Sequence, residues 1–231
     1  MMRMDSIRAA VAPPGRHAVT NASRKGDESR LRILEAALVE FGAGGYRSTT
    51  TRSIADRAKT TLPPLNYYFG SKEGLYRACA EEIVLRYSEI TNDAVSGATQ
   101  IIQSVSSPET ARSALKTLVA ASVRLIIGSP VFILGNGIIA RELSEPGPAF
   151  DIFYEQLWLP GIERNAKLIS RIKGEVDVSA ESRLQSILLI SSLPSFHARR
   201  RVAQKAMQWS GIGESELNLL IEVLHRQIDQ I

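Results

Sequence analysis

The segment Thr49–Lys72, with the sequence TTTRSIADRAKTTLPPLNYYFGSK, constrains the fold of this chain more than any other. Threonines are favourable helix N-caps, and adjacent prolines are tolerated in the first helical turn, where the amides have no intrahelical partner. The pattern predicts a helix over 49–58 that is capped by Thr49, a tight turn, and a short helix over 61–69. Leu65 and Phe69, four residues apart, are expected to face the core.

An amphipathic helix is predicted just before this segment. Asp27 is a suitable N-cap, and apolar side chains recur at helical spacing from Leu31 to Phe41, before glycines end the helix. The three helices form a helix-turn-helix unit, in which the last helix enters the major groove of DNA. Residues 1–26 show no apolar periodicity and are predicted to be a disordered tail.

Helical spacing continues almost to the C-terminus. Helices are expected over 71–92, 108–128, 130–143, 148–172, 178–208 and 213–230. Pro160 and Pro194 should kink or split two of them. Because no strand-like alternation occurs, the chain is predicted to be all-α. The expected domains are an N-terminal three-helix DNA-binding domain over 27–75 and a C-terminal helical bundle over 76–231 for ligand binding and dimerisation.

Charge is unevenly distributed between these domains. Residues 1–75 hold twelve Lys/Arg against seven Asp/Glu, a net charge of +5, whereas residues 76–231 hold 16 against 17, a net charge of −1. A basic excess at the DNA-reading end suits phosphate neutralisation, although such an excess is also common on solvated surfaces. A single cysteine, no secretory signal and no membrane-length apolar run predict a cytoplasmic protein without membrane contact.

The sequence contains none of the common catalytic signatures: no G-x-S-x-G, no H-E-x-x-H and no P-loop. Its three histidines are scattered over residues 17, 197 and 225, too far apart in sequence to suggest a metal site with one cysteine. We therefore expect no catalytic residues, no metal and no cofactor. Two alternatives stay open, an enzyme and a helical small-molecule carrier, each with a vestigial DNA-binding unit.

The chain resembles the tetracycline-repressor (TetR) family of bacterial regulators. The resemblance is carried, in order between residues 28 and 76, by AALVEF, Gly45-Tyr46, TTTRSIADRA and LNYYFGSKEGLY. It implies a ligand-responsive transcriptional regulator, most often a repressor, that binds a double-stranded DNA operator. Where the family usually has glycine, this chain has Lys59, which is expected to adopt a left-handed backbone conformation at modest strain.

Specific DNA contacts follow from side-chain chemistry and from these matched positions. Arg52 has the planar fork that suits guanine O6 and N7, and Asn66 can bond adenine. Leu62 and Pro63 can pack on thymine methyl groups, and Thr61 can make either kind of base contact. The resemblance implies phosphate contacts from Thr50, Tyr67, Tyr68 and Lys72. Lys72 also starts a helix, whose N-terminus favours anions.

A small-molecule effector is expected to bind within the C-terminal bundle. Seven of the 14 aromatic residues lie in 132–209, and such residues can wrap an apolar ligand. The expected pocket residues are Phe132, Phe150, Phe153, Tyr154 and Trp158. The same side chains are equally compatible with a solid core. The polar groups that could orient a ligand are Asn136, Arg141, Glu142 and His197, of which Arg141 and Glu142 should point apart as helical neighbours.

Two further segments, ARELSEPGPAFDIFYEQLWLPGIER and QWSGIGESEL, resemble the branch of the family named for CecR, over roughly residues 140–220. That branch implies a homodimer and a helical effector domain but no particular ligand. In the family, the last two long helices pair across a two-fold axis. The corresponding contact residues are Leu184, Ile187, Leu188, Leu217, Leu220 and Leu224. A two-fold dimer predicts an operator that is an approximate inverted repeat.

Overall fold

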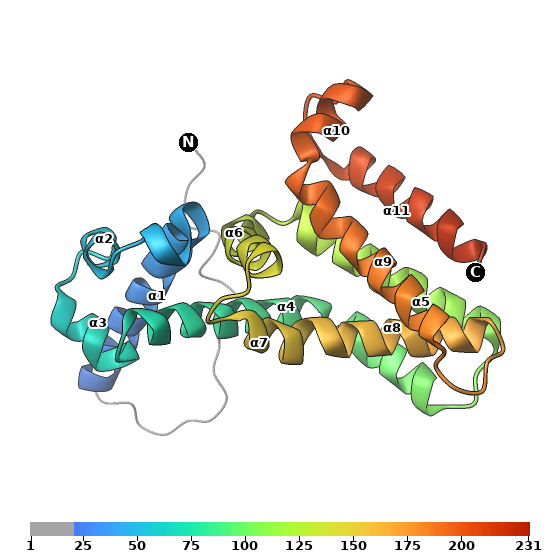
Figure 1. Cartoon of the computed structure of the whole chain (residues 1–231), viewed down its shortest axis with the longest axis horizontal. Coiled ribbons are helices and arrows are strands. Elements are labelled where there is room, and N and C mark those ends of the chain that lie inside the picture. The colour runs from blue at the N-terminus through green and yellow to red at the C-terminus, as the bar shows by residue number, and fades with distance from the viewer. Residues whose placement is uncertain (1–20) are drawn as a thin grey trace.

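The fold is organised around one long helix, α4 (Lys72–Gln103), which runs from the small N-terminal helices to the C-terminal bundle (Figure 1). The computed structural model describes residues 21–231, with the side chains of residues 25–129 and 135–231. Residues 1–20 of the predicted tail lie outside the described residues. The N-terminus of α4 is capped by Ser71, whose hydroxyl accepts a hydrogen bond from the amide of Gly74 at 3.0 Å.

Three helices precede α4, and their bounds are α1 (Asn21–Ser48), α2 (Thr51–Arg57) and α3 (Leu62–Phe69). The prediction that the first helix begins near Asp27 is wrong, because α1 already includes residues 21–26. No proline interrupts those residues, and Gly26 costs only about 1 kcal/mol in a helix. The predicted glycine stop is confirmed at Gly45, where φ is 80° and ψ is 173°, values outside the helical region.

The rest of the chain is also helical. In chain order it contains α5 (Pro108–Val123), the π-helical segment η2 (Arg124–Gly128), α6 (Pro130–Ser144), α7 (Phe150–Phe153), the π-helical segment η3 (Tyr154–Trp158), α8 (Leu159–Ile172), α9 (Ala180–Ala198), α10 (Arg200–Met207) and α11 (Glu214–Asp229). No strand occurs between residues 21 and 231, so the all-α prediction is confirmed.

The two predicted proline breaks differ in outcome. Pro160 follows η3 at the start of α8, where the prediction of a split helix is confirmed. Pro194 instead lies inside α9, and the helix predicted over 178–208 is interrupted at Arg199. The amide of Arg199 bonds the carbonyls of both Ser195 and Phe196, which ends α9 in a tight turn before α10 begins.

Two buried clusters form the interior. The first lies among α1–α4 and extends to Ile138 of α6 and Phe153 of α7. The second joins the C-terminal half of α4 to α5, α8, α9 and α11. Ile126 of η2 packs against both clusters. The first cluster contains residues on both sides of residue 75, where the domain boundary is predicted. The division into domains at that residue stays a prediction. None of the described helices is long and apolar enough to cross a membrane.

Candidate DNA-reading surface and ligand cavity

The segment that connects α2 and α3 has the geometry of a tight turn. The N-cap of α2 is Thr50 and not Thr49, since the Thr50 hydroxyl accepts a hydrogen bond from the amide of Ser53 at 3.1 Å. Thr49 is buried, and its hydroxyl donates to the Glu40 carbonyl at 3.1 Å. The two threonines are chemically equivalent caps, so packing against α1 decides which one is used.

Lys59 occupies the centre of this turn with a φ of 52°, which confirms the predicted left-handed conformation. Its amide bonds the Asp56 carbonyl at 3.1 Å, and the next amide, that of Thr60, bonds the Ala55 carbonyl at 3.0 Å. These bonds satisfy the carbonyl groups at the end of α2 and set the direction in which α3 begins.

Helix α3 is held by one face and exposed on the other. Leu65 is fully buried, and Phe69 is half-buried beneath the guanidinium carbon of Arg30, 5.3 Å from the ring centroid. On the outer side Asn66 is exposed and Tyr67 is 83% exposed. The ring of Tyr67 contacts the neighbouring Tyr68, with centroids 5.1 Å apart, but most of it faces solvent, so the outer side of α3 is available to a partner.

The residues expected to read bases lie around the beginning of α3 and on α2. Thr61, Pro63 and Asn66 are exposed, and Leu62 is half-buried. Thr61 occupies the N-cap position but its side chain makes no capping hydrogen bond, so its hydroxyl remains available. The positions are consistent with base contacts, which remain predictions.

The arginines of α2 differ in their partners. Arg57 donates to Glu40 at 2.6 Å, and this hydrogen bond holds the pKa of Glu40 below its usual value. Arg52 is exposed, and no carboxylate among the described side chains pairs with it. Arg57 is therefore part of the α1–α2 contact, whereas the guanidinium of Arg52 is available to DNA.

The four residues expected to hold phosphates are also placed. Thr50 and Tyr67 are exposed, and Tyr68 is half-buried against the first cluster. Lys72 lies over the Tyr46 ring, with Nζ 4.7 Å from the centroid, and donates weakly to the Arg47 carbonyl at 3.4 Å. These contacts hold the ammonium group beside the N-terminus of α4, a location that favours anions.

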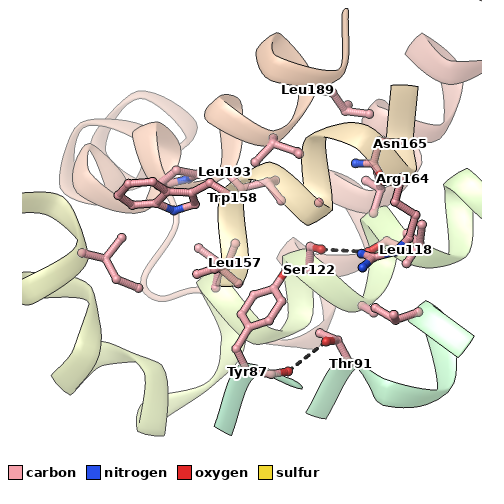
Figure 2. A pocket seen from close by; sticks show the side chains of 18 of the residues that line it. Tyr87, Thr91, Leu118, Ser122, Leu157, Trp158, Arg164, Asn165, Leu189 and Leu193 are labelled. Carbon is pink, nitrogen blue, oxygen red and sulfur yellow. Dashed lines mark hydrogen bonds between the residues drawn. The ribbon is translucent and has the colours of Figure 1, made fainter. Parts of the chain in front are cut away.

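A cavity of about 90 Å³ lies where α4, α5, α8 and α9 meet η2, α6 and η3 (Figure 2). Figure 2 shows Trp158 on one side of it and Arg164 on the other. Both π-helical segments contribute to its wall, η2 through Ile126 and η3 through Leu157 and Trp158. Short π-helical segments occur frequently at functional sites, so their presence here favours a binding role.

The cavity does not coincide with the predicted aromatic pocket, which stays a prediction. Of the predicted aromatic residues whose side chains are described, Trp158 alone lines the cavity. Phe153 is fully buried in the first cluster, while Phe150 and Tyr154 stack on each other with centroids 6.1 Å apart. The side chain of Phe132 lies outside the described residues. Aromatic content cannot say which face of α7 is turned toward the cavity, because that orientation depends on how α7 packs against α4.

Of the polar groups predicted to orient a ligand, only Asn136 lines the cavity, and the prediction did not include Arg164, Asn165, Thr91 and Ser122, which also line it. A signal for Asn165 does exist in the sequence. Asn165 lies on the same face of α8 as Leu168, Ile169 and Ile172, all buried, so a polar residue interrupts an apolar stripe. Arg164 gives no comparable signal, because arginine next to such a stripe usually reaches solvent.

Helix α6 connects the cavity to the DNA-reading unit. Arg141 donates to the carbonyls of Gly42 at 2.8 Å and Ala43 at 2.7 Å, near the end of the regular part of α1. Its neighbour Glu142 is buried and accepts from the Tyr76 hydroxyl at 2.8 Å, so the predicted divergence of these two side chains is confirmed. Burial, followed by the bond to Glu142, raises the pKa of Tyr76.

The predicted dimer residues divide between the two helices. On α9, Leu184, Ile187 and Leu188 are all exposed, as an interface would require. On α11 the prediction for Leu217 is wrong, because this side chain is only 5% exposed and lies in the second cluster. Leu220 and Leu224 are half-buried against the same cluster. The predicted stripe of α11 packs on α5 of its own chain, and the apolar residues that α11 leaves exposed are Leu219 and Val223.

Within the described residues, no three His, Cys, Asp or Glu side chains lie close enough together to hold a metal ion. Cys79 is buried in the first cluster, where burial raises the pKa of its thiol. A buried protonated thiol is a poor nucleophile, so Cys79 contributes packing to the DNA-reading end.

Comparison with known proteins places these features in context. Residues 33–79 match the family model "Bacterial regulatory proteins, tetR family", and residues 111–231 match "HTH-type transcriptional dual regulator CecR, C-terminal domain". The chain is 26% identical to the HTH-type transcriptional dual regulator CecR of Shigella flexneri over 211 residues, which cover 90% of this chain and 92% of that protein.

Solved structures of the same fold include a TetR-like transcriptional regulator from Rhodococcus sp. RHA1, with a TM-score of 0.63 and 20% identity over 86% of this chain and 94% of that one. Another is the regulator FadR of Bacillus subtilis in complex with stearoyl-CoA, with a TM-score of 0.58 and 13% identity over 86% and 97% of the two chains.

Proposed function

The chain belongs to the TetR family of bacterial transcriptional regulators, and from this premise we propose that it binds an inverted-repeat operator as a homodimer whose affinity a small-molecule effector changes. Repression is the proposed output. The observation that carries the DNA-binding part is the outer side of α3, where Asn66 and Tyr67 are exposed while Leu65 anchors the helix. No reaction is assigned to the chain.

Selection of bound duplexes from a genomic or random pool tests this function directly. We expect enrichment of an inverted repeat whose half-sites lie about 34–36 Å apart, one turn of B-form DNA or a multiple of it. Analytical ultracentrifugation of the complex should give an even number of protomers per operator. A carrier or enzyme with a vestigial reader would enrich no sequence, and that outcome would refute the proposal.

If Arg52 and Asn66 contact bases, replacing either residue should reduce affinity for the operator more than affinity for random DNA. Arg52→Ala and Asn66→Ala should each weaken operator binding by about 1–3 kcal/mol and relax the preference at one position of each half-site, because a bidentate base contact is lost. The measurement is fluorescence anisotropy with operator and random duplexes. Arg201→Ala, an exposed arginine on α10, serves as the control. Equal losses on both duplexes would exclude base reading by these side chains.

Phosphate binding by Lys72 predicts a change in salt dependence. Lys72→Met keeps the apolar stem over Tyr46 and removes the charge, so the slope of log K against log salt should become shallower by about 1 for each protomer bound. Affinity should fall on operator and random duplexes alike. Lys167→Met on the exposed surface of α8 is the matched control. A slope equal to that of the unmodified protein would remove Lys72 from the phosphate contacts.

Effector control is supported by the position of α6. Asn136, Ile139 and Leu143 of this helix line the cavity, while Arg141 binds carbonyls of α1. A ligand that alters the position of α6 therefore acts on the DNA-reading unit through one rigid element. A ligand with different affinity for two arrangements of the dimer shifts their populations, with a typical coupling of about 1–3 kcal/mol. A ligand that fills the cavity and leaves operator affinity unaltered would refute this part.

A further inference from the structure

The cavity wall contains hydrogen-bond donors for which the described part of the chain supplies no acceptor. The hydroxyls of Thr91 and Ser122 are satisfied within their own helices, by the carbonyls of Tyr87 at 2.8 Å and Leu118 at 2.9 Å. By contrast, the buried Nδ2 of Asn136 has no hydrogen-bond partner among the described residues. Buried amide donors are normally paired, so this group points to an acceptor that the chain does not supply.

The guanidinium of Arg164 indicates a bound acceptor group more strongly than the amide of Asn136 does. It is half-buried in the cavity wall, and no hydrogen bond or ion pair to its guanidinium is formed by the residues that the structure describes. None of the described residues that line the cavity is acidic. Burial lowers the pKa of Arg164, which reflects the cost of placing its charge there without a carboxylate.

Other arginines nearby are fully engaged, which sets Arg164 apart. Arg171, two turns further along α8, donates to the carbonyls of Ile102 and Ser104 at 3.0 Å each and to the Ser106 hydroxyl at 2.9 Å. Arg183 of α9 pairs with Glu163 at 2.9 Å. Of these three arginines, Arg164 alone lines the cavity, and it alone has no hydrogen bond or ion pair with the described residues.

We propose that the cavity binds a small organic anion, with its carboxylate or equivalent acidic group against Arg164 and its apolar body against Trp158. Figure 2 shows these two side chains on opposite sides of the cavity. The apolar part of the cavity wall also includes Leu157, Leu189 and Leu193. A guanidinium binds a carboxylate through two parallel hydrogen bonds, and Asn136 offers a further donor. The inference deepens the proposed function, since it rests on this cavity being the effector site.

The size of the cavity adds a requirement. At about 90 Å³ it is smaller than the roughly 150 Å³ cavity in which benzene is known to bind. An aromatic acid can therefore enter only if the helices around the cavity move apart. Helix α6 forms part of the cavity wall and is one of these helices. Ligand entry and displacement of α6 are expected to occur together, which gives an anion a physical route to the DNA-reading unit.

Matched pairs of acids and amides test the ligand class. The probes are benzoate, phenylacetate and 4-phenylbutyrate, each compared with its neutral primary amide. Binding is followed by quenching of Trp158 fluorescence in the full chain carrying Trp209→Phe, which leaves Trp158 as the only tryptophan. At least one acid should bind about tenfold or more tightly than its amide, because charge-assisted hydrogen bonds are about twice as strong as neutral ones.

Variants of Arg164 decide whether that preference comes from this side chain. Arg164→Met should reduce the acid-to-amide affinity ratio to about one, and Arg164→Lys, which keeps the charge, should restore part of it. Arg201→Met is the control and should keep the full ratio. Circular dichroism and cooperative thermal unfolding establish that each variant is folded. Equal affinity for acids and amides, an unchanged ratio in Arg164→Met, or no quenching by any acid at millimolar concentration would each overturn the inference.

The same acids separate this inference from the proposed switch. Operator affinity of the unmodified protein is measured with and without saturating acid. A change in affinity supports both the ligand class and the switch. Acids that bind in an Arg164-dependent way but leave operator affinity unchanged support the ligand class and refute effector control.

Discussion

Replacing Leu188 with glutamate is expected to make the protein monomeric and to lower operator affinity by about 10²–10⁴-fold, because a monomer loses the effective concentration that links two half-sites. Leu188 is 63% exposed on α9, beside the exposed Leu184 and Ile187. This helix and α11 lie at the end of the molecule away from α2 and α3 (Figure 1). A buried unpaired charge at a two-fold seam is repeated on both protomers, which makes it strongly destabilising.

Size-exclusion chromatography with light scattering measures the dimer, and anisotropy measures the operator. Val105→Glu places the same charge on a fully exposed valine between α4 and α5 and should change neither quantity. Leu219→Glu on α11 should act like Leu188→Glu, because Leu219 is exposed and the predicted Leu217 is not. A Leu188→Glu protein that remains dimeric would show that this face of α9 is not the interface.

Replacing Gly137 with alanine is expected to destabilise the fold by about 3 kcal/mol, the upper part of the range for overpacked sites. A Cβ atom at Gly137 would lie 2.1 Å from the carbonyl oxygen of Gly42, which is backbone and cannot rotate away. Helix α6 must then move from α1. Such a movement also strains the bond between Arg141 and the Gly42 carbonyl. The midpoint of thermal unfolding should fall by roughly 6–12 °C for a chain of this length.

Gly97 provides the matched control. It lies inside α4, and apart from its chain neighbours and the backbone of its own helix no heavy atom is within 4 Å of the position that its Cβ would take. Gly97→Ala should stabilise the protein by about 0.4–1 kcal/mol, since alanine restricts the unfolded chain and favours the helix. Differential scanning calorimetry compares the two variants. An unchanged midpoint in Gly137→Ala would mean that α6 does not pack on α1 as closely as described.

Much of the DNA-reading unit could be predicted because its signals are local. The prolines that begin α3, the left-handed Lys59 and the break at Gly45 each depend on backbone geometry within a few residues. The cap of α2 was misplaced by one residue, because Thr49 and Thr50 are equally good caps in isolation. Only the hydrogen bond from Thr49 to α1 distinguishes them.

The cavity shows where local reasoning fails. Aromatic enrichment indicated Phe150, Phe153 and Tyr154 as pocket residues. In the structure Phe153 belongs to the first buried cluster, and the rings of Phe150 and Tyr154 stack on each other. The cavity wall combines residues from four helices, α6 and the two π-helical segments. No single segment contains the information about which side chains face that gap. The same holds for Leu217, which α5 covers within its own chain.

The amino-acid sequence by itself determined the all-helical class and the turn between α2 and α3, because helix periodicity, caps and turn residues act over short stretches of chain. The family followed from the resemblance of ordered motifs such as LNYYFGSKEGLY to those of the TetR family. The tertiary structure alone decided that Arg164 forms no hydrogen bond or ion pair with the described residues, that α6 joins the cavity to α1, and which apolar residues of α11 stay exposed. Those properties arise from burial and contact between segments up to about one hundred residues apart, such as Arg141 and Gly42, and packing rather than local propensity determines them.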